Sequence, residues 1–359
     1  MAKRAVGRSR TTLTGIAEAA GVSVATVSKV VNGRSDVSPG TRARIERLLV
    51  EHDYVARGTA GSRSPVRIVD LTFNHLVAPN NLVITRGVTE AAAEAGVDVV
   101  IGMTPDDPSG AAWTRKIVNA GREGVILVTS ELTPQQRAQF KKAGIPLVLI
   151  DPMGVPDESV PSIGATNFSG GMAATEHLLS LGHRRIAMIE GRHDALCNTA
   201  RLHGYQAALR SAGITPDPRL IKRGEFHFEP AYEAARDLFA LEDLPTAVFA
   251  ANDSEAFGVI EAARVHGLRV PEDVSVVGFD DTVAAATSAP PLTTVRQPFA
   301  EIGRAALRTL LRLAAAQPLD SHRVELATQL VVRASTTAPP VRAGTPAPAP
   351  SAAVPGDAP

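Results

Sequence analysis

Cysteine is nearly absent from this sequence, which holds only Cys197 among its 359 residues. A single cysteine excludes an intramolecular disulfide and any metal centre built from cysteine thiolates. Long apolar runs are also lacking, because no stretch approaches the roughly 18 apolar residues that a membrane helix needs. The first residues are basic and lack the apolar core of a secretory signal. We therefore expect a cytoplasmic protein with no membrane segment. Because the histidines show no ligand spacing either, we expect no metal site and no cofactor.

Net charge is lacking too, since 37 basic residues balance 37 acidic ones. The balance conceals an asymmetry: residues 1–67 hold 12 Lys or Arg against 5 Asp or Glu, whereas residues 68–359 hold 25 against 32. A compact basic head on an acidic body is typical of a protein that binds a polyanion at one end. The alternative is a flexible basic tail, but only Lys3, Arg4, Arg8 and Arg10 precede the first helical pattern.

Three short helices are predicted in this basic head. Thr12 can cap a helix over residues 13–20, which Gly21 ends, and Ser23 can cap a second helix over residues 24–31. A third begins at Ser38, with Pro39 at its first position. The apolar stripes of the three helices can close a small core. Two short helices joined by a three-residue turn predict a helix-turn-helix.

The outer face of the second helix carries only small or polar side chains. A helix that enters a major groove roughly 12 Å wide needs such residues where base edges are close. Valine and alanine can contact thymine methyl groups, hydroxyls suit phosphates or bases, and lysine suits phosphate or guanine. The alternative is an ordinary three-helix bundle with a polar face. The predicted DNA contacts in this part are Thr12, Ser23, Val24, Ala25, Thr26, Ser28, Lys29 and Asn32.

The stretch "TLTGIAEAAGVSVATVSKVVNGRSDVSPGTRARIERLLVEHDY" resembles the DNA-binding head of the LacI/GalR family of bacterial transcription repressors. The resemblance continues to about residue 335. In that family a Tyr-x-Pro segment and a hinge helix follow the head, and a leucine of this helix wedges into the minor groove.

The corresponding stretch here, "DYVARGTAGSRSPVRIVDL", keeps Tyr54 but lacks the proline and the leucine and contains Gly58 and Gly61. Two glycines cost roughly 1 kcal/mol each against helix formation, so we expect no independently stable hinge helix. Arginines can instead reach phosphates or a narrow minor groove. A flexible linker is an equal alternative. The predicted DNA contacts in this part are Tyr54, Arg57 and Arg63, with Arg67 as a further candidate.

Apolar runs alternate with amphipathic helical stretches from Val66 onward, as in "VRIVDLTF", "VDVVIGM", "GVILVT", "PLVLID", "RRIAMIE", "TAVFAAN" and "VSVVGFDD". This alternation predicts parallel sheets covered by helices on both faces. About 270 residues of it exceed one domain core, so we expect two doubly wound halves. The resemblance implies a periplasmic-binding-protein type I body, with chain crossings between halves near Ala165, Arg296 and Leu326.

The predicted fold class is therefore α/β, with a three-helix helix-turn-helix head and a body of two doubly wound parallel-sheet subdomains. The predicted boundaries are a basic tail over 1–10, the head over 11–57, a hinge or linker over 58–66, an effector-binding and dimerisation domain over 67–335, and a disordered Pro/Ala-rich tail over 336–359. Within the body, the N-subdomain takes about 67–165 and 296–325, and the C-subdomain about 166–295 and 326–335.

Polar residues at strand ends predict a ligand site, because ligands of open parallel sheets bind beyond the carboxyl ends of the strands. Donors, acceptors and an aromatic face suit a polyol. Taken singly, the aromatic residues can be core, Asp253 and Asp281 can cap helices, and Arg201 can form a structural ion pair. By resemblance, the effector contacts fall on Arg201, Asn252, Asp280 and Phe226, with Phe299 and Leu82 as wall candidates.

The stretch "NFSGGMAATEH" places Gly170 and Gly171 at a helix start, where glycines can cradle an anion. The P-loop lysine is absent, so we interpret it instead as the helix that follows a crossing between the halves.

One head reads too few base pairs for specificity, so we expect a homodimer on near-palindromic double-stranded operator DNA. The resemblance places the dimer face around residues 82–95. The hypothesis is a repressor controlled by a small molecule, with a sugar expected because the family uses sugars most often. One alternative is a solute-binding protein without regulatory activity, which would not need the basic head and would require an export signal. Another is an enzyme, but the sequence has neither a nucleophile–base motif nor a glycine fingerprint.

Overall fold

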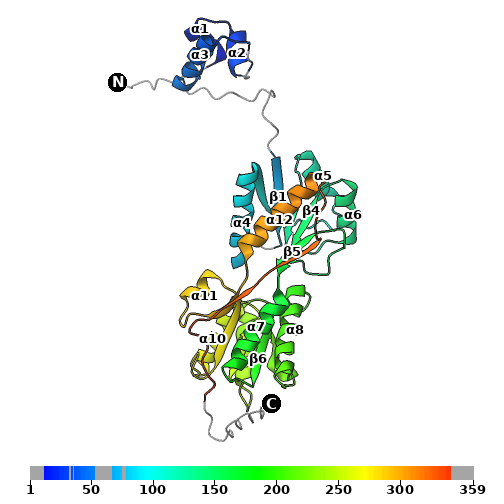
Figure 1. Ribbon diagram of the computed structural model, residues 1–359, viewed down its shortest axis with the longest axis vertical. Helices are drawn as coiled ribbons and strands as arrows, with labels where there is room; N and C mark the ends of the chain where they lie inside the picture. Colours follow the sequence, from blue (N-terminus) through cyan, green and yellow to red (C-terminus); the bar gives the residue numbers. More distant parts are fainter. Residues whose placement is uncertain (1–11, 32–33, 35, 53–66, 75–77, 341–359) are drawn as a thin grey trace, which may run out of the picture. The chain divides into compact units, whose positions relative to one another are not determined.

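The computed structural model describes residues 12–31, 34, 36–52, 67–74 and 78–340, and the chain divides into two units, 1–66 and 67–359. The first unit holds α1 (Leu13–Ala20), α2 (Val24–Val31) and α3 (Pro39–Glu51), which confirms the three predicted helices (Figure 1). The Thr12 hydroxyl accepts a hydrogen bond from the Gly15 amide, and Gly21 ends α1 in the left-handed region with φ 62°. The buried core of this unit comprises Ile16, Ala17, Ala20, Val27, Val30 and Ile45.

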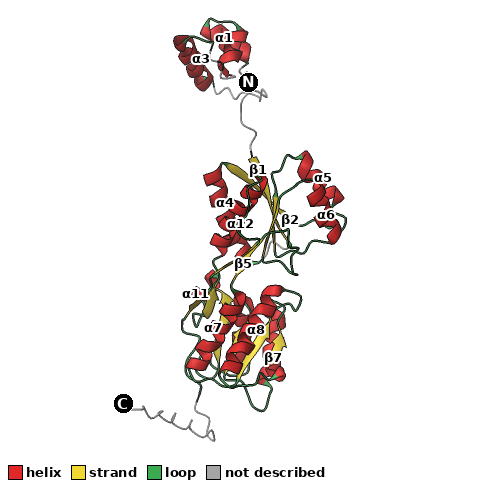
Figure 2. Ribbon diagram, turned by 45° about the vertical axis from the view of Figure 1, so that its right-hand side comes forward, coloured by secondary structure: helices red, strands yellow, loops and turns green. Residues whose placement is uncertain are grey.

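The first sheet of the second unit is entirely parallel, in the order β11-β5-β4-β3-β1-β2. Its strands are β1 (Arg67–Phe73), β2 (Val97–Met103), β3 (Val125–Val128), β4 (Leu147–Ile150), β5 (Ser162–Ala165) and β11 (Arg323–Leu326). Alternate residues of β3 and β4 enter two different cores. One core is shared with α4 (Pro79–Ala95) and α12 (Phe299–Ala314), the other with α5 (Ala111–Asn119) and α6 (Pro134–Lys142). Helices therefore cover both faces of the sheet, as Figure 2 shows.

The second sheet has the order β12-β10-β9-β8-β6-β7 and is parallel except for β12. Its strands are β6 (Ile186–Glu190), β7 (Ile221–Arg223), β8 (Ala247–Ala250), β9 (Ser275–Asp280), β10 (Thr293–Arg296) and β12 (Gln329–Val331). One core includes residues of α7 (Asn167–Ser180) and α8 (Leu196–Ser211), the other residues of α9 (Phe228–Phe239) and α10 (Asp253–Val265). The short helix α11 spans Val283–Thr287, and a 3₁₀ turn spans Pro218–Leu220. Two doubly wound halves, as predicted, thus form the body.

The chain passes between the two sheets three times, after β5, β10 and β11. The last residues of these strands are Ala165, Arg296 and Leu326, the positions near which the family resemblance places the crossings. In each half the strand order reverses around the first strand, between β1 and β3 and between β6 and β8. Such reversal points are where open α/β sheets bind ligands.

Residues directly after position 335 contact the second half of the body. Thr336 hydrogen-bonds to the His177 ring at 3.0 Å, and the Thr337 carbonyl lies 2.8 Å from the buried His183 ring. The segment expected to be disordered therefore begins with residues held against the second half of the body. No helix in the described part of the chain is long and apolar enough to cross a membrane.

Candidate DNA-binding face and effector site

The outer face of α2 presents the side chains that the sequence predicts for DNA contact. Ser23, Val24, Ala25 and Lys29 are exposed, and Thr26 and Ser28 are half-buried. The Ser23 hydroxyl accepts a hydrogen bond from the Thr26 amide at 3.1 Å, so it caps α2 as well as lying on its leading edge. The capping residue Thr12 is also exposed. The remaining predicted contacts, Asn32, Tyr54, Arg57 and Arg63, lie outside the described residues, and so does the predicted hinge.

Two cations expected to meet DNA have acidic partners. The Lys29 ammonium lies 2.7 Å from the Asp36 carboxylate, and both side chains are at least half exposed. This hydrogen bond holds the pKa of Asp36 below its usual value. Arg67, within β1, donates to both carboxylate oxygens of Glu123 at 2.7 and 2.8 Å. Exposed ion pairs are weak, so a phosphate can replace Asp36 as the partner of Lys29.

Replacing Lys29 and replacing Asp36 are expected to change the affinity for operator in opposite directions. Lys29→Ala removes a cation from the exposed face of α2 and should weaken binding several-fold and lower the salt slope by about one. Asp36→Asn removes the competing anion and should tighten binding a few-fold at low salt. Fluorescence anisotropy over a salt series measures both. If Asp36→Asn weakens binding as much as Lys29→Ala does, the pair holds the fold of the head instead.

Arg201 is the centre of the polar cluster at the carboxyl end of the second sheet. Arg201 lies on α8, and only 4% of the residue's surface is exposed. Nε donates to Asn167 Oδ1 at 2.8 Å, and Nη1 donates to the Ala251 carbonyl, just beyond β8, at 2.6 Å. The guanidinium carbon stacks 3.8 Å from the ring centroid of Phe279. The Arg201 guanidinium is therefore fixed in position at the point where the strand order reverses.

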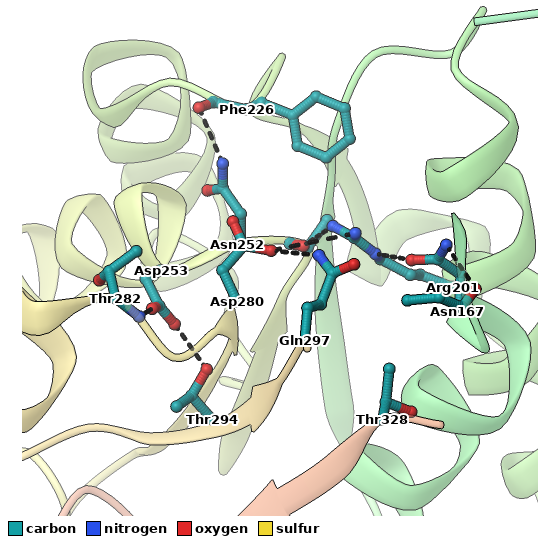
Figure 3. Close-up of polar contacts among 12 residues, drawn as sticks. Asn167, Arg201, Phe226, Asn252, Asp253, Asp280, Thr282, Thr294, Gln297 and Thr328 are labelled. Atoms are coloured by element: carbon teal, nitrogen blue, oxygen red, sulfur yellow. Dashed lines mark hydrogen bonds and ion pairs between the residues drawn. The ribbon is translucent and has the colours of Figure 1, made fainter. Parts of the chain in front are cut away.

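Asp280 faces Arg201 from the end of β9. Its Oδ1 lies 4.0 Å from Arg201 Nη2 and accepts a hydrogen bond from Gln297 Nε2 at 2.6 Å. The other amide atom, Gln297 Oε1, is buried and has no hydrogen-bond partner among the described residues. Buried polar atoms are rarely left unpaired, so this oxygen is an acceptor open to a ligand. Figure 3 shows these side chains directed toward one another.

Asn252 and Phe226 border the same cluster, but Asn252 also has a structural role. Asn252 Oδ1 accepts from the Glu255 amide at 2.8 Å and caps α10, while Nδ2 donates to the Phe226 carbonyl at 3.1 Å (Figure 3). The Phe226 ring is half-buried, and its centroid lies 5.8 Å from the Arg201 guanidinium carbon. Phe226 therefore offers an aromatic face beside the cation.

The two wall candidates have different surroundings. Phe299, the first residue of α12, is 5% exposed and belongs to a core of the first half, so its core alternative fits its surroundings. Leu82 lies on α4 with 77% of its surface exposed. Asp253 and Asp281 have structural partners: Asp253 accepts from Thr282 and Thr294, whereas Asp281 forms ion pairs with Arg296 and Arg333.

Backbone strain marks the same region. Of the seven described non-glycine residues with positive φ, six follow or end strands, and Ala316, after α12, is the exception. Left-handed conformations cost free energy in such residues and cluster at ligand sites. The six residues are Thr129, Asp151, Glu225, Phe226, Asp280 and Asp281.

Acidic groups outnumber cations around Arg201. Burial raises the pKa of Asp151 to about 6 and that of Glu255 to about 8, although the Arg201 charge opposes both shifts. Burial also raises the pKa of Asp253 and of Asp280. The Arg201 guanidinium therefore lies among several carboxyl groups that are costly to ionise, which disfavours a further anion in the site.

Three members of the cluster are absent from the sequence prediction. Asp151 follows β4, so the strand-end rule that selects Asp280 also selects Asp151. Asn167 and Gln297 follow β5 and β10, two short strands that are not among the apolar runs picked out in the sequence. In the sequence, only their position beside a crossing between the two halves could have indicated a role for these residues.

A helix-turn-helix head in one chain with a two-lobed body that holds a polar cluster at its strand ends defines a DNA-binding regulator that responds to a ligand. Residues 12–56 match the family "Bacterial regulatory proteins, lacI family", and residues 175–336 match "Periplasmic binding protein-like domain". The HTH-type transcriptional regulator CelR of Thermobifida fusca is 34% identical over 336 residues, 91% of this chain and 99% of the relative. The HTH-type transcriptional repressor CytR of Escherichia coli (strain K12) is 33% identical over 332 residues, 92% of this chain and 97% of the relative.

Solved structures agree with this assignment. A complex of the transcriptional regulator CelR with cellobiose has a TM-score of 0.69 at 35% identity and covers 91% of this chain and 100% of that chain. A lac repressor dimer bound to operator and the anti-inducer ONPF has a TM-score of 0.76 at 28% identity and covers 92% and 100%. The chain belongs to the LacI family. It is a DNA-binding transcriptional regulator, and its relatives are regulators rather than enzymes.

Proposed function

We propose that this protein is a repressor whose affinity for a near-palindromic operator is set by a sugar bound at the Arg201 cluster. The observation that carries the proposal is the unpaired Gln297 Oε1 beside Asp280 and Arg201 at the strand ends. A repressor that binds chromosomal DNA acts in the bacterial cytoplasm. The solved CelR complex with cellobiose supports a sugar as the class of effector.

The chemistry of the cluster suits a neutral polyol. Asp280, Asp151 and Gln297 offer acceptors for hydroxyl donors, Arg201 offers a donor, and Phe226 offers an apolar face for C–H groups. The Arg201 charge is already paired, since Nη2 lies 4.0 Å from the Asp280 carboxylate while Nε and Nη1 donate to Asn167 and Ala251, so it is poorly placed to neutralise an added anion. We therefore expect unmodified sugars to bind more tightly than their phosphorylated forms.

We also propose a homodimer that forms through α4 and β2. Strand β2 is an edge of the first sheet, and Val100, Ile101 and Met103 along it are exposed. Leu82 is exposed on α4, which packs beside β2. An exposed apolar edge strand is an aggregation hazard unless something covers it, and a second copy of this chain would cover it. Leu82 thus fits the expected dimer face better than the pocket wall.

The first experiment is fluorescence anisotropy of the full chain with duplex DNA from upstream of its own gene, over a salt series, with and without a panel of sugars. Tight, salt-sensitive binding that one sugar shifts is the expected result. Tight binding that is indifferent to every sugar would reject the sugar effector and keep the regulator. Sugar binding without any specific DNA binding would support the solute-binding alternative.

Effector affinity is expected to fall as the pH falls through about 6. Hydroxyls that donate to Asp151 or Asp280 favour the ionised carboxylates, so the pKa of each group is lower in the occupied site than in the empty one. Affinity is then full above the pKa of the empty site and lost below it. We expect calorimetry to show roughly tenfold weaker binding at pH 5 than at pH 7.5. Asp151→Asn should flatten this profile, and an unchanged profile in that variant would assign the titration to another group.

A further inference from the structure

A hollow lies between the two halves of the body, beside the Arg201 cluster. It is a cavity of about 430 Å³, bounded by one face of α8, by the edge formed by β5 and β11, and by the chain that follows β4. Its volume lies in the range of roughly 300–1,000 Å³ that is typical of sites for small organic ligands. Arg201, Asn252, Phe226 and Asp280 are not among the residues that line it.

Helix α8 and its neighbours join this cavity to the Arg201 cluster. Cys197 lies one turn before Arg201 on α8 and lines the cavity. Asn167 lines the cavity too, and its Oδ1 accepts the hydrogen bond from Arg201 Nε. Asp151 also lines the cavity, and the charge of Arg201 acts on its carboxyl group by opposing the rise in pKa that burial causes. The cavity and the cluster therefore adjoin each other across these three side chains.

The lining of the cavity favours hydroxyl groups over anions. Among the described residues that line it, Arg323 is the one cation of fixed charge. Its two terminal nitrogens donate to the carbonyls of Pro156, Asp157, Val160 and His322. The carboxylates that line it, Asp151 and Glu325, are acceptors for hydroxyl donors.

The same cavity also offers apolar contacts. Leu196, Pro152 and Val324 line it and give C–H surface against which a sugar ring can pack. The guanidinium of Arg323 is already occupied by backbone carbonyls and is not free to pair with a phosphate, whereas a neutral ring finds both acceptors and apolar contacts.

We propose that this cavity is the subsite for a second sugar ring, so that the effector is a disaccharide or a longer oligosaccharide that spans the Arg201 cluster and the cavity. This inference rests on the proposed sugar effector and adds its length. One ring meets Arg201, Asp280 and Phe226. The next ring passes Cys197 and lies between α8 and the β5–β11 edge.

The test compares monosaccharides with their disaccharides by calorimetry on the full chain, using the pairs glucose and cellobiose, xylose and xylobiose, and mannose and mannobiose. Ala200 lines the cavity and is half-buried on α8, so Ala200→Phe fills the subsite. Ala207 is equally half-buried on the same helix but does not line the cavity, so Ala207→Phe is the matched control. Glu325→Gln provides a second variant, which removes the charge of an acceptor without adding bulk.

We expect one disaccharide to bind at least roughly 30-fold more tightly than its monosaccharide. Ala200→Phe should bring the two affinities within about threefold of each other and leave that of the monosaccharide unchanged. Ala207→Phe should keep the full preference, and Glu325→Gln should reduce it.

A monosaccharide that binds as tightly as its disaccharide to the unaltered protein would overturn the subsite and leave the sugar effector standing. An Ala200→Phe variant that keeps the preference, or that loses both sugars alike, would do the same. If no sugar of the panel binds, the sugar effector is rejected and the subsite with it.

Discussion

Asp280→Ala is expected to abolish the response of operator binding to the effector while the affinity for operator without effector stays unchanged. Asp280 supplies the carboxylate opposite Arg201 and accepts the hydrogen bond from Gln297 at 2.6 Å. Its removal leaves a buried cation and a buried amide without their partner. Losing a charged hydrogen-bond partner in a desolvated site typically costs 2–5 kcal/mol of binding, so the effector should bind at least about 30-fold more weakly.

The measurement is anisotropy of labelled operator, titrated with effector, for the unaltered protein and three variants. Asp280→Asn keeps the shape and an acceptor but not the charge, so an intermediate loss is expected and separates charge from fold. Asp273→Ala removes an aspartate of the same half that is paired with Arg269 on the surface, and its response should be normal. A normal response in Asp280→Ala would exclude Asp280 from the effector site.

The head could be predicted from the sequence because its signals are local. The caps Thr12 and Ser23 and the terminator Gly21 act on residues within one turn of themselves, so the helix bounds follow from short patterns. Strand ends are local too, and they led to Asn252 and Asp280. The spacing of Asn252 and Glu255 also forms a capping box, a readable sign that the Asn252 side chain is used by α10.

The rest of the cluster depends on long-range contacts that no local pattern reveals. Gln297 reaches Asp280 because the chain crosses between sheets directly after β10, and Asn167 reaches Arg201 because α7 packs on α8. Phe299 and Leu82 show the converse. Each is apolar and lies in the first turn of its helix, yet tertiary packing buries Phe299 and exposes Leu82. Sequence alone does not distinguish a pocket wall from a core or a dimer face.

Gly171→Ala is expected to destabilise the body and to weaken effector binding at the same time. A methyl group at Gly171 would lie 2.4 Å from the Arg201 carbonyl oxygen and 2.9 Å from its Cα. Gly204, on the facing helix, would place one 2.2 Å from the Phe168 carbonyl oxygen. Helices α7 and α8 thus touch backbone to backbone, and no rotation of a side chain can relieve the clash. This contact, and not an anion cradle, accounts for the glycine at position 171.

An added methyl group must push the helices apart by about 1 Å to reach ordinary contact distance. Overpacking of this kind typically costs 1–3 kcal/mol, which lowers the melting temperature of a domain this size by roughly 3–10 °C. The displaced backbone is that of Arg201, so its guanidinium moves relative to Asp280 and effector affinity falls as well.

Calorimetric unfolding and effector titration test both expectations, with Gly40→Ala as the control. No atom of the described residues lies within 4 Å of a methyl group at Gly40, which is exposed in α3. The same substitution there should be neutral or slightly stabilising, because alanine favours helix by about 1 kcal/mol. If Gly171→Ala melts at the temperature of the unaltered protein, close helix contact does not fix α8. If it melts lower but binds effector normally, Arg201 is held by Asn167 and Ala251 independently of the helix spacing.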